Sequence, residues 1–414
     1  MIQKNIGAMD ENNKEELGED GSKTGVEFEE EELFDTPFNP DSISIESRVV
    51  TMDALIRRFR QGSINLAPNF QRKMVWDDKR RSRLIESMML KIPLPMFYVA
   101  ATSQGTWDVV DGLQRLSAIR DFILGDKDKK ILTLSNLEFW GERFNGKTFK
   151  EIDEQGEYAR IVNSIMETEL RFTLINPGTP EEVKRNVFRR INTGGMPLTP
   201  QEIRHALYQG KSTKLLARFA NASSFKNAIG SPLGDSRMAA QEIILRFLAF
   251  SLRDYKTYEV SMDTFLSNTM QIINNTPNLS DEDLKKIFQG RKIPEIYEFD
   301  IKGLQTRFNT AMTRNKALFG KHAFRKSCGS GGSRSPVHKA LFESFGNVLV
   351  DLEQEDFEFL LEHKETLHNL CYELMNNDGF IADIGRGSTS VKGVKGRYMK
   401  ITKMIDDVLE RGVE

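Results

Sequence analysis

The sequence predicts an α+β fold in which a mixed sheet-and-helix domain is followed by an all-helical domain. Short apolar strands alternate with helical segments over residues 45–203. Over residues 204–414 the apolar residues recur almost wholly at helical spacing. Residues 1–44 hold 13 acidic residues and three lysines, a net charge of −10. With so little apolar surface to bury, this stretch is expected to be a disordered acidic tail.

The composition is that of a globular chain with an uneven charge. The 414 residues are 39% hydrophobic and carry a net charge of −2, so removing the tail's −10 leaves +8 on the rest. The tail either mimics nucleic acid and masks a basic surface or serves only as a solubilising leader. No apolar run approaches the roughly 20 residues needed to span a bilayer. Two cysteines, Cys328 and Cys371, without a signal peptide predict a reducing, cytoplasmic location and no membrane partner.

The first elements follow from local patterns in chain order. Residues 47–62 indicate a short strand and then a helix, and residues 64–76 form a loop around Pro68-Asn69 that presents Gln71 and Arg72. A helix is expected from about 77 to 91, where Pro93 ends it. Residues 96–101 and 107–110 are expected to pair as a hairpin.

The stretch from Asp111 to Arg115 is the main candidate site. It is a tight turn that leads from the second hairpin strand into a helix whose apolar face is Leu113, Leu116, Ile119, Phe122 and Ile123, with Gly125 at its C′ position. Gly112 lets a ligand approach the backbone closely, and Arg115 lies one turn into the positive end of the helix, as in an anion cradle. The alternative is that Asp111 and Gln114 form a capping box and that Arg115 is a solvated surface charge.

Several separated blocks carry a family resemblance. Asp111-Gly-Leu-Gln-Arg115 resembles the Asp-Gly-Gln-Gln-Arg motif of the ParB/sulfiredoxin-like domain of GmrSD-type modification-dependent restriction enzymes. The preceding loop at 68–72 and the stretches around Trp76 and 92–95 are similar as well, and the resemblance spans about 45–400. The spacing of Gly112, Arg115 and Ala118 is also similar to the phosphate motif of ParB proteins.

The resemblance implies a nucleotide-binding domain that hydrolyses NTP with Mg²⁺ in a DNA restriction or phage-defence system. In this interpretation Arg115 neutralises phosphate charge, Asp111 orients water or metal, and Gln114 positions the attacking water. Gly112 and Gln71 would contact the nucleotide, and Arg72 would bind a second phosphate. Leu113 stands where the family motif has its first Gln, and this departure puts hydrolysis more in doubt than binding.

A second segment of interest follows the predicted helix 180–191, which begins with Pro180 at N1. Gly194-Gly195 breaks the pattern, and Thr199 with Glu202 then forms a capping box for a new helix. The structural role therefore explains Glu202. Asn192, by resemblance to ParB proteins, would meet a phosphate or its Mg²⁺ ion, which favours oxygen ligands.

The helical half contains two basic, glycine-rich segments. Helices are expected at about 243–250, 265–273, 280–288 with Ser280 as N-cap, 296–318, 337–352, 357–375 and 398–409. Both segments are expected to be flexible loops and suit DNA phosphate contacts, although ordinary solvated loops explain them equally. Their candidate nucleic-acid residues are Arg325, Lys326, Arg334, Arg386, Lys392, Lys395 and Arg397.

Other patterns are decoys or absences. Gly141–Thr148 matches the Walker A pattern, but it lacks the strand before it and the long helix after it that a P-loop requires. His368 and Cys371 share a helix face without the further ligands of a zinc site. No His-Asn-His nuclease signature is found, so self-contained DNA cleavage is not expected. The alternatives to an NTPase are a non-catalytic DNA-binding module and a regulatory subunit whose nuclease lies on another chain.

Overall fold

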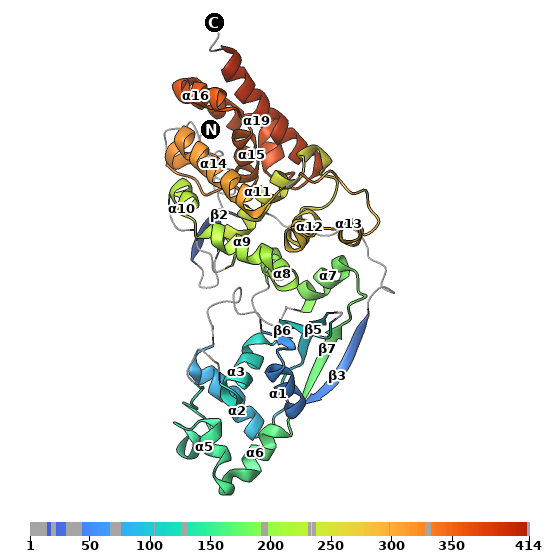
Figure 1. Cartoon of the computed structure of the whole chain (residues 1–414). Helices are drawn as coiled ribbons and strands as arrows, with labels where there is room; N and C mark the ends of the chain where they lie inside the picture. The colour runs from blue at the N-terminus through green and yellow to red at the C-terminus, as the bar shows by residue number, and fades with distance from the viewer. Residues whose placement is uncertain are drawn as a thin grey trace, which may run out of the picture. The chain divides into compact units, whose positions relative to one another are not determined.

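The computed structural model describes residues 15–17, 22–29, 44–66, 76–102, 104–125, 131–191, 198–230, 233, 237–297, 299–327 and 333–411. The chain divides into two compact units (Figure 1). The sheet unit is Thr36–Leu207, and the helical unit is Tyr208–Glu414 together with Met1–Asp35. The division lies close to the predicted one after residue 203, but the N-terminal segment belongs with the helices.

The sheet unit is built on a five-stranded mixed sheet with the strand order β3-β7-β5-β6-β4. β3 pairs antiparallel with β7, β7 parallel with β5, β5 antiparallel with β6, and β6 parallel with β4. The predicted hairpin of residues 96–101 and 107–110 is therefore confirmed. The strands are β3 (Ile45–Thr51), β4 (Ile64–Asn65), β5 (Phe97–Ala101), β6 (Trp107–Asp111) and β7 (Glu169–Ile175).

β7 lies inside the sheet and was missed in the sequence. Its alternation is regular, because Leu170, Phe172 and Leu174 are buried while Glu169 and Arg171 are exposed. The ring of Phe172 stacks on Phe97 at a centroid distance of 5.1 Å and is tilted against Trp107 at 5.2 Å. This aromatic contact ties β5, β6 and β7 together from one side of the sheet.

Helices cover that apolar face (Figure 1). The buried side chains of α1, α2, α3 and α6 pack with the strands in one core. Asp77 caps α2, because its side chain accepts from the Arg80 N–H, and Gly125, predicted at the C′ position of α3, has a φ of +70°. The helices are α1 (Met52–Arg60), α2 (Asp78–Met89), α3 (Leu113–Ile123), α4 (Gly141–Phe144), α5 (Phe149–Asp153), α6 (Ala159–Met166), α7 (Glu181–Ile191) and α8 (Pro200–Leu207).

The helical unit packs around α11, whose 14 residues are all buried. α14 and α15 flank it, and Phe247 of α11 meets Phe308 of α14 and Phe342 of α15 edge-on. A helix that is buried on every side is expected at the centre of a domain. The helices are α9 (Lys211–Ala220), α10 (Ser223–Ile229), α11 (Ala239–Leu252), α12 (Met262–Asn275), α13 (Asp281–Phe288), α14 (Ile301–Phe319), α15 (Lys339–Val350), α16 (Gln354–Glu362), α17 (Lys364–Met375), α18 (Asp378–Ile384) and α19 (Val391–Arg411).

Two sequence-based expectations for this unit are wrong. The single helix expected over 357–375 is two helices, α16 and α17, that meet at His363. The basic segment 385–397 is not a loop throughout, because α19 begins at Val391. Its glycines allow close packing instead. A Cβ on Gly393 would lie 2.0 Å from the Gly387 carbonyl oxygen, and one on Gly396 would lie 2.4 Å from Asp383 Oδ2.

The acidic N-terminal segment is also ordered where the structure describes it, which corrects the expectation of disorder. β1 (Glu15–Leu17) and β2 (Lys23–Glu27) form an antiparallel pair, and Val26 of β2 bridges to Val337 of the helical unit. Glu29 binds Arg246, and its Oε1 accepts from the Ser388 hydroxyl at 2.5 Å. These carboxylates find cationic partners in the helical unit, which composition alone does not reveal.

Cys371 of α17 is fully buried and disulfide-bonded.

Candidate functional site

The turn between β6 and α3 holds the sequence-predicted site. A register shift places Asp111 opposite Tyr98, two positions along β6 from the Val99–Val109 pair, so one extra residue bulges the strand just before the turn. Gly112 is the N-cap of α3 with a φ of +93°. A Cβ at this position would lie 2.4 Å from Phe97 Cδ1, so both the backbone angle and the space require glycine.

Arg115 fastens this turn to the start of β5. Its Nη2 donates to Asp111 Oδ2 at 2.9 Å and to the Met96 carbonyl at 3.2 Å, and its Nη1 donates to the Pro95 carbonyl. The guanidinium also lies 4.5 Å from the ring centroid of Phe97. Burial lowers the pKa of Arg115, and the Asp111 carboxylate opposes that shift. In the alternative interpretation Arg115 is a solvated surface charge. Its side chain is instead partly buried and forms an ion pair with Asp111.

The N-terminus of α3 is left without a side-chain cap. The Asp111–Gln114 capping box is therefore absent. Within the described residues, the Gln114 side chain makes no hydrogen bond, and it is partly exposed. The first-turn N–H groups of α3 and the Gln114 amide are thus available to a ligand, and the helix dipole there favours an anion.

The same face of the sheet carries a second carboxylate. Asp108 accepts from Asn65 Nδ2 at 3.1 Å, and burial raises the pKa of Asp108 while Asn65 and Lys184 of α7 oppose the rise. Ala100 pairs with Asp108 and Tyr98 pairs with Asp111, and Tyr98 and Ala100 are two apart on β5. Asp108, Asp111 and Tyr98 therefore point to one side, away from the aromatic core.

α8 packs on β6 and adds a buried polar cluster that the sequence analysis missed. The predicted capping box is confirmed, because the Thr199 N–H donates to Glu202 Oε2 at 2.7 Å and the Glu202 N–H donates to Thr199 Oγ1 at 3.1 Å. Beyond this cap, the helix buries polar groups on every side. The cluster is Arg185 of α7 with Gln201, Glu202, Arg204 and His205 of α8.

Three predicted ligand residues, Gln71, Arg72 and Asn192, lie outside the described residues. The structure therefore brings together Asp111, Gly112, Gln114 and Arg115 and is silent on the other three.

The described residues do not fit a metal ion held by the protein alone. No group of three or more His, Cys, Asp or Glu side chains with the arrangement of a metal site occurs among them. Of the two carboxylates nearest the turn, one Asp111 oxygen bonds Arg115 and one Asp108 oxygen bonds Asn65. A Mg²⁺ ion that arrives with a nucleotide needs few protein ligands, because phosphates and water complete its shell.

The predicted nucleic-acid residues around 325–334 are largely committed to the protein. Arg325 is 3% exposed, donates to the carbonyls of Ile229 and Ser335, and has its pKa lowered to about 10 by burial, with Arg334 adding to the shift. Lys326 Nζ lies 2.6 Å from Glu27 Oε1. Arg334 is exposed, and its Nη1 donates to the Gly230 carbonyl at 3.3 Å. Arg325 therefore supports the fold and is removed from the predicted nucleic-acid set.

The basic residues of the second segment, 385–397, also differ in how exposed they are. Arg397 is fully buried and paired with the equally buried Glu343, so it too is removed from that set. Lys395 is half-buried on α19. Arg386 and Lys392 are exposed, and neither makes an ion pair among the described residues.

The Walker A match is not a P-loop, as predicted. α4 has only four residues, and Thr148 caps the five-residue α5 in a capping box with Glu151. Lys147 Nζ donates to Tyr158 Oη at 3.2 Å and lies 4.5 Å from the centroid of that ring. The lysine that would hold phosphate is thus packed on an aromatic side chain.

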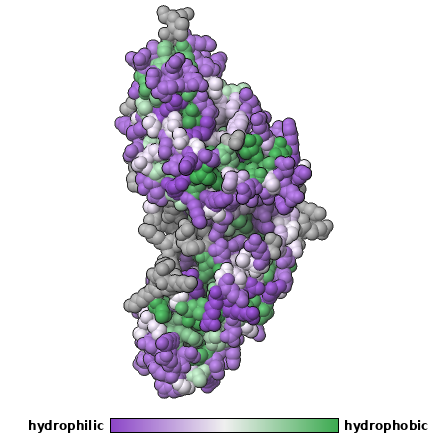
Figure 2. All heavy atoms as spheres, in the orientation of Figure 1, coloured by the Kyte–Doolittle hydropathy of each residue, from purple (hydrophilic) through white to green (hydrophobic). Residues whose placement is uncertain are grey.

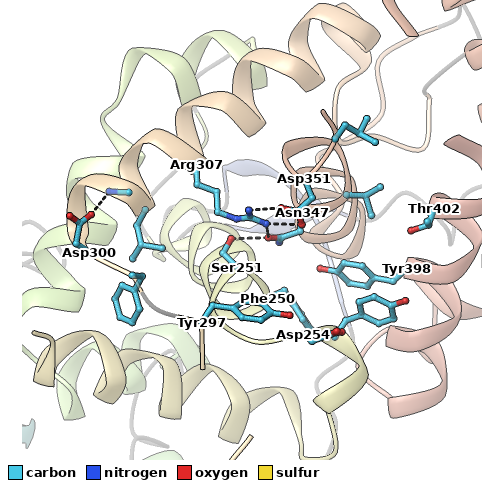
Figure 3. Close-up of a pocket in the computed structure, with 16 residues that line it drawn as sticks. Phe250, Ser251, Asp254, Tyr297, Asp300, Arg307, Asn347, Asp351, Tyr398 and Thr402 are labelled. Atoms are coloured by element: carbon cyan, nitrogen blue, oxygen red, sulfur yellow. Dashed lines mark hydrogen bonds and ion pairs between the residues drawn. The ribbon is translucent and has the colours of Figure 1, made fainter. Parts of the chain in front are cut away.

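A cavity of about 990 Å³ in the helical unit was not predicted. It is lined by residues of α11, α14, α15 and α19 and by the segments around 254–255 and 297–300. Its lining is aromatic and acidic, and Figure 3 shows its polar side chains. These residues are far apart in the sequence, so no local pattern marks them.

Comparison with known proteins identifies one domain. Residues 54–209 match the family of the GmrSD restriction endonuclease N-terminal domain. Neither the comparison with curated proteins nor that with solved structures found a match to the chain. In the part of the chain that the structure describes, no helix combines the length and hydropathy needed to cross a bilayer.

Proposed function

We propose that this chain binds and hydrolyses a nucleoside triphosphate. The proposal starts from the match of residues 54–209 to the GmrSD restriction endonuclease N-terminal domain family. The family indicates a component of a restriction or phage-defence system. The nucleotide step is our addition to that role. It rests on one observation, the uncapped N-terminus of α3 directly after the β6 bulge.

The geometry of the turn supports distinct roles for its residues. Phosphate oxygens would accept from the first-turn N–H groups of α3, where Gly112 lets them approach the backbone. Gln114, which has no partner in the described residues, would position the attacking water. Arg115 acts as a positioning residue, because its donors already hold Asp111 and two carbonyls of residues 95 and 96. Asp111 has one carboxylate oxygen left to accept from that water.

In hydrolysis the water oxygen forms a bond to the terminal phosphorus, the bond to the bridging oxygen breaks, and the nucleoside diphosphate leaves. The proton of the water passes to Asp111 or to solvent. No step is assigned to a protein-held metal. Arg72 and Asn192 keep their predicted phosphate roles, which the described residues do not test.

The test is NTP binding and phosphate release for the full chain with Mg²⁺. Gln114→Ala is expected to lower the release rate by about 10²-fold or more and to leave binding nearly unchanged, as removal of one water-positioning or transition-state contact typically does. Asp111→Asn keeps an acceptor for Arg115 and should also slow release. Gln61→Ala is the matched control, because exposed Gln61 precedes β4, which pairs with the opposite end of β6. A wild-type chain that binds none of the four NTPs would refute the proposal.

A second candidate is non-catalytic DNA binding through Arg386 and Lys392. Their exposure without ion partners among the described residues favours it. Their joint replacement by Ala should weaken DNA binding at all sequences and reduce the salt slope by about 2. Lys285→Ala with Lys286→Ala on α13 is the charge-matched control. Equal losses in both double variants would show a net-charge effect and reject the candidate.

A further inference from the structure

The cavity of the helical unit is large enough to enclose a small organic molecule. Its volume of about 990 Å³ lies at the upper end of the range for ligand pockets. α11, α14, α15 and α19 form its walls, and all of them belong to one compact unit. The lining residues are Phe250, Ser251, Asp254, Tyr255, Tyr297, Phe299, Asp300, Gly303, Leu304, Arg307, Asn347, Val348, Asp351, Leu352, Tyr398 and Thr402.

Aromatic rings supply much of the wall. Tyr255 and Tyr398 stack at a centroid distance of 4.5 Å with an interplanar angle of 7°, and Phe250 is tilted against Tyr398 at 5.4 Å. Tyr297 is 43% exposed and faces the same space (Figure 3). The ammonium of Lys256, outside the cavity, already lies 5.8 Å from the centroid of Tyr255. Aromatic faces of this kind attract cations and cover methylene chains.

The charges of the lining are mostly negative. Three carboxylates, Asp254, Asp300 and Asp351, line the cavity with one cation, Arg307. Arg307 is neutralised, because it donates to both oxygens of Asp351 at 2.5 and 2.9 Å. Asp254 and Asp300 have no ion-pair partner among the described residues. The lining therefore keeps a net charge of −2 without a cation to balance it.

The two unbalanced carboxylates are fixed in place by helix capping. One Asp254 oxygen accepts from the Lys256 N–H at 2.8 Å, and one Asp300 oxygen accepts from the Gly303 N–H at 2.5 Å at the start of α14. Each keeps a second oxygen for a ligand. Burial raises the pKa of Tyr297, and the charge of Asp254 adds to the rise, as expected in a negative potential.

The carboxylates lie at different ends of the cavity. Asp300 precedes Arg307 by seven residues, which at 1.5 Å per residue is about 10 Å along α14. In the view of Figure 3, the side chain of Arg307 appears between those of Asp300 and Asp254. Two separate carboxylates on one lining suit a flexible chain that carries an ammonium group at each end.

We propose that this cavity binds a linear aliphatic polyamine, with one ammonium group at Asp254, another at Asp300, and the methylene chain over the tyrosine rings. A nucleotide fits this lining poorly, because its phosphates meet two unbalanced carboxylates. The site is separate from the proposed nucleotide site, so either proposal can fail without the other.

The test is calorimetric titration of the full chain with spermidine, and with putrescine as a shorter diamine. Asp254→Asn and Asp300→Asn remove one charge each but keep the capping acceptor, because Asn caps helices as well as Asp does. Each is expected to weaken spermidine binding by about fivefold, and the double variant by more, from the loss of an ion pair at a partly exposed site. Putrescine should bind more weakly than spermidine and respond to only one substitution.

Asp281→Asn is the matched control, since it removes an exposed carboxylate of α13 outside the cavity. Tyr297→Leu should weaken binding without a change of charge. Equal weakening by Asp281→Asn would show that polyamine is held only by net charge and would overturn the proposal. The absence of any spermidine binding would also overturn the proposal. So would titration with a nucleoside that binds in the cavity with an affinity unchanged by Asp254→Asn and Asp300→Asn.

Discussion

The ion pair of Glu29 with Arg246 gives a quantitative test of whether the acidic segment is part of the helical unit. Glu29 Oε1 accepts from Arg246 Nη1 at 3.3 Å and from Ser388 at 2.5 Å, and its other oxygen binds Arg246 Nη2. Burial alone raises the pKa of Glu29, but Arg246 and Lys339 outweigh it and lower the pKa from 4.5 to about 2. The charged carboxylate is therefore the stable form in the folded chain.

The size of the effect follows from linkage. Lowering the pKa of Glu29 from 4.5 to about 2 corresponds to roughly 3 kcal/mol of folding free energy. Removing one partner of a buried pair typically costs about 3–5 kcal/mol, so the two routes agree. Glu242 Oε1 stays 3.6 Å from Arg246 after the loss of Glu29, which favours the lower figure. We therefore expect Glu29→Gln to destabilise the helical unit by about 3 kcal/mol at pH 7.

The pH dependence has a definite sign. Because the folded pKa of Glu29 is depressed, its contribution is fully present above about pH 5 and is lost as the pH falls toward 2. Wild type and Glu29→Gln should thus differ most at neutral pH and converge in acid.

The assay is urea unfolding followed by far-UV circular dichroism, which reports mainly the helices. All three tryptophans, Trp76, Trp107 and Trp140, lie in the sheet unit, so their fluorescence follows the other unit separately. Glu282→Gln, an exposed carboxylate on α13, controls for the charge change. A loss below about 0.5 kcal/mol for Glu29→Gln, equal to a surface substitution, would refute the reasoning.

Three further predictions follow from packing and burial. Gly393→Ala should destabilise the helical unit by at least about 2 kcal/mol in a thermal melt, because the new methyl group would lie 2.0 Å from the Gly387 carbonyl oxygen. Gly178→Ala is the control and should be near neutral, because its new methyl group has no atom within 4 Å. Gly112→Ala should lower the free energy of unfolding of the sheet unit, followed by tryptophan fluorescence, by about 2–4 kcal/mol, since it adds an unfavourable φ to a 2.4 Å contact with Phe97. An unchanged free energy of unfolding would contradict the geometry of the turn. Burial lowers the pKa of His338 from 6.5 to about 3, and the charge of Lys326 adds to the shift. The free energy of unfolding should therefore fall by on the order of 2 kcal/mol between pH 6.5 and pH 5. His338→Gln should abolish that part of the pH dependence in urea titrations.

Local chemistry explains which predictions are confirmed. The Ser280 cap, the Thr199–Glu202 capping box and the hairpin of β5 and β6 depend on residues within a few positions of one another. Such signals are present in any conformation of the chain. The sequence alone also showed that Gly141–Thr148 is not a P-loop, because the strand before it and the long helix after it are missing from the neighbouring residues.

The site itself was only half predictable. The Asp111–Arg115 motif and the need for Gly112 were visible in the sequence, and the family match over 54–209 supports the domain assignment. The partners of Arg115, which are carbonyls of residues 95 and 96, were not visible in the sequence. The polar cluster of α7 and α8 and the aromatic cavity join residues from distant segments.

The sequence by itself determined the fold class, most helices and the turn that carries the candidate site, because caps, periodicity and glycine geometry act locally. Only the tertiary structure decided which charges are available. Arg325 and Arg397 are charged residues of ordinary appearance in the sequence, yet both are buried against partners from far along the chain, and Glu29 is partly buried against Arg246. Burial and long-range pairing reverse the usual expectation for a charged side chain, because desolvation makes its one partner decisive.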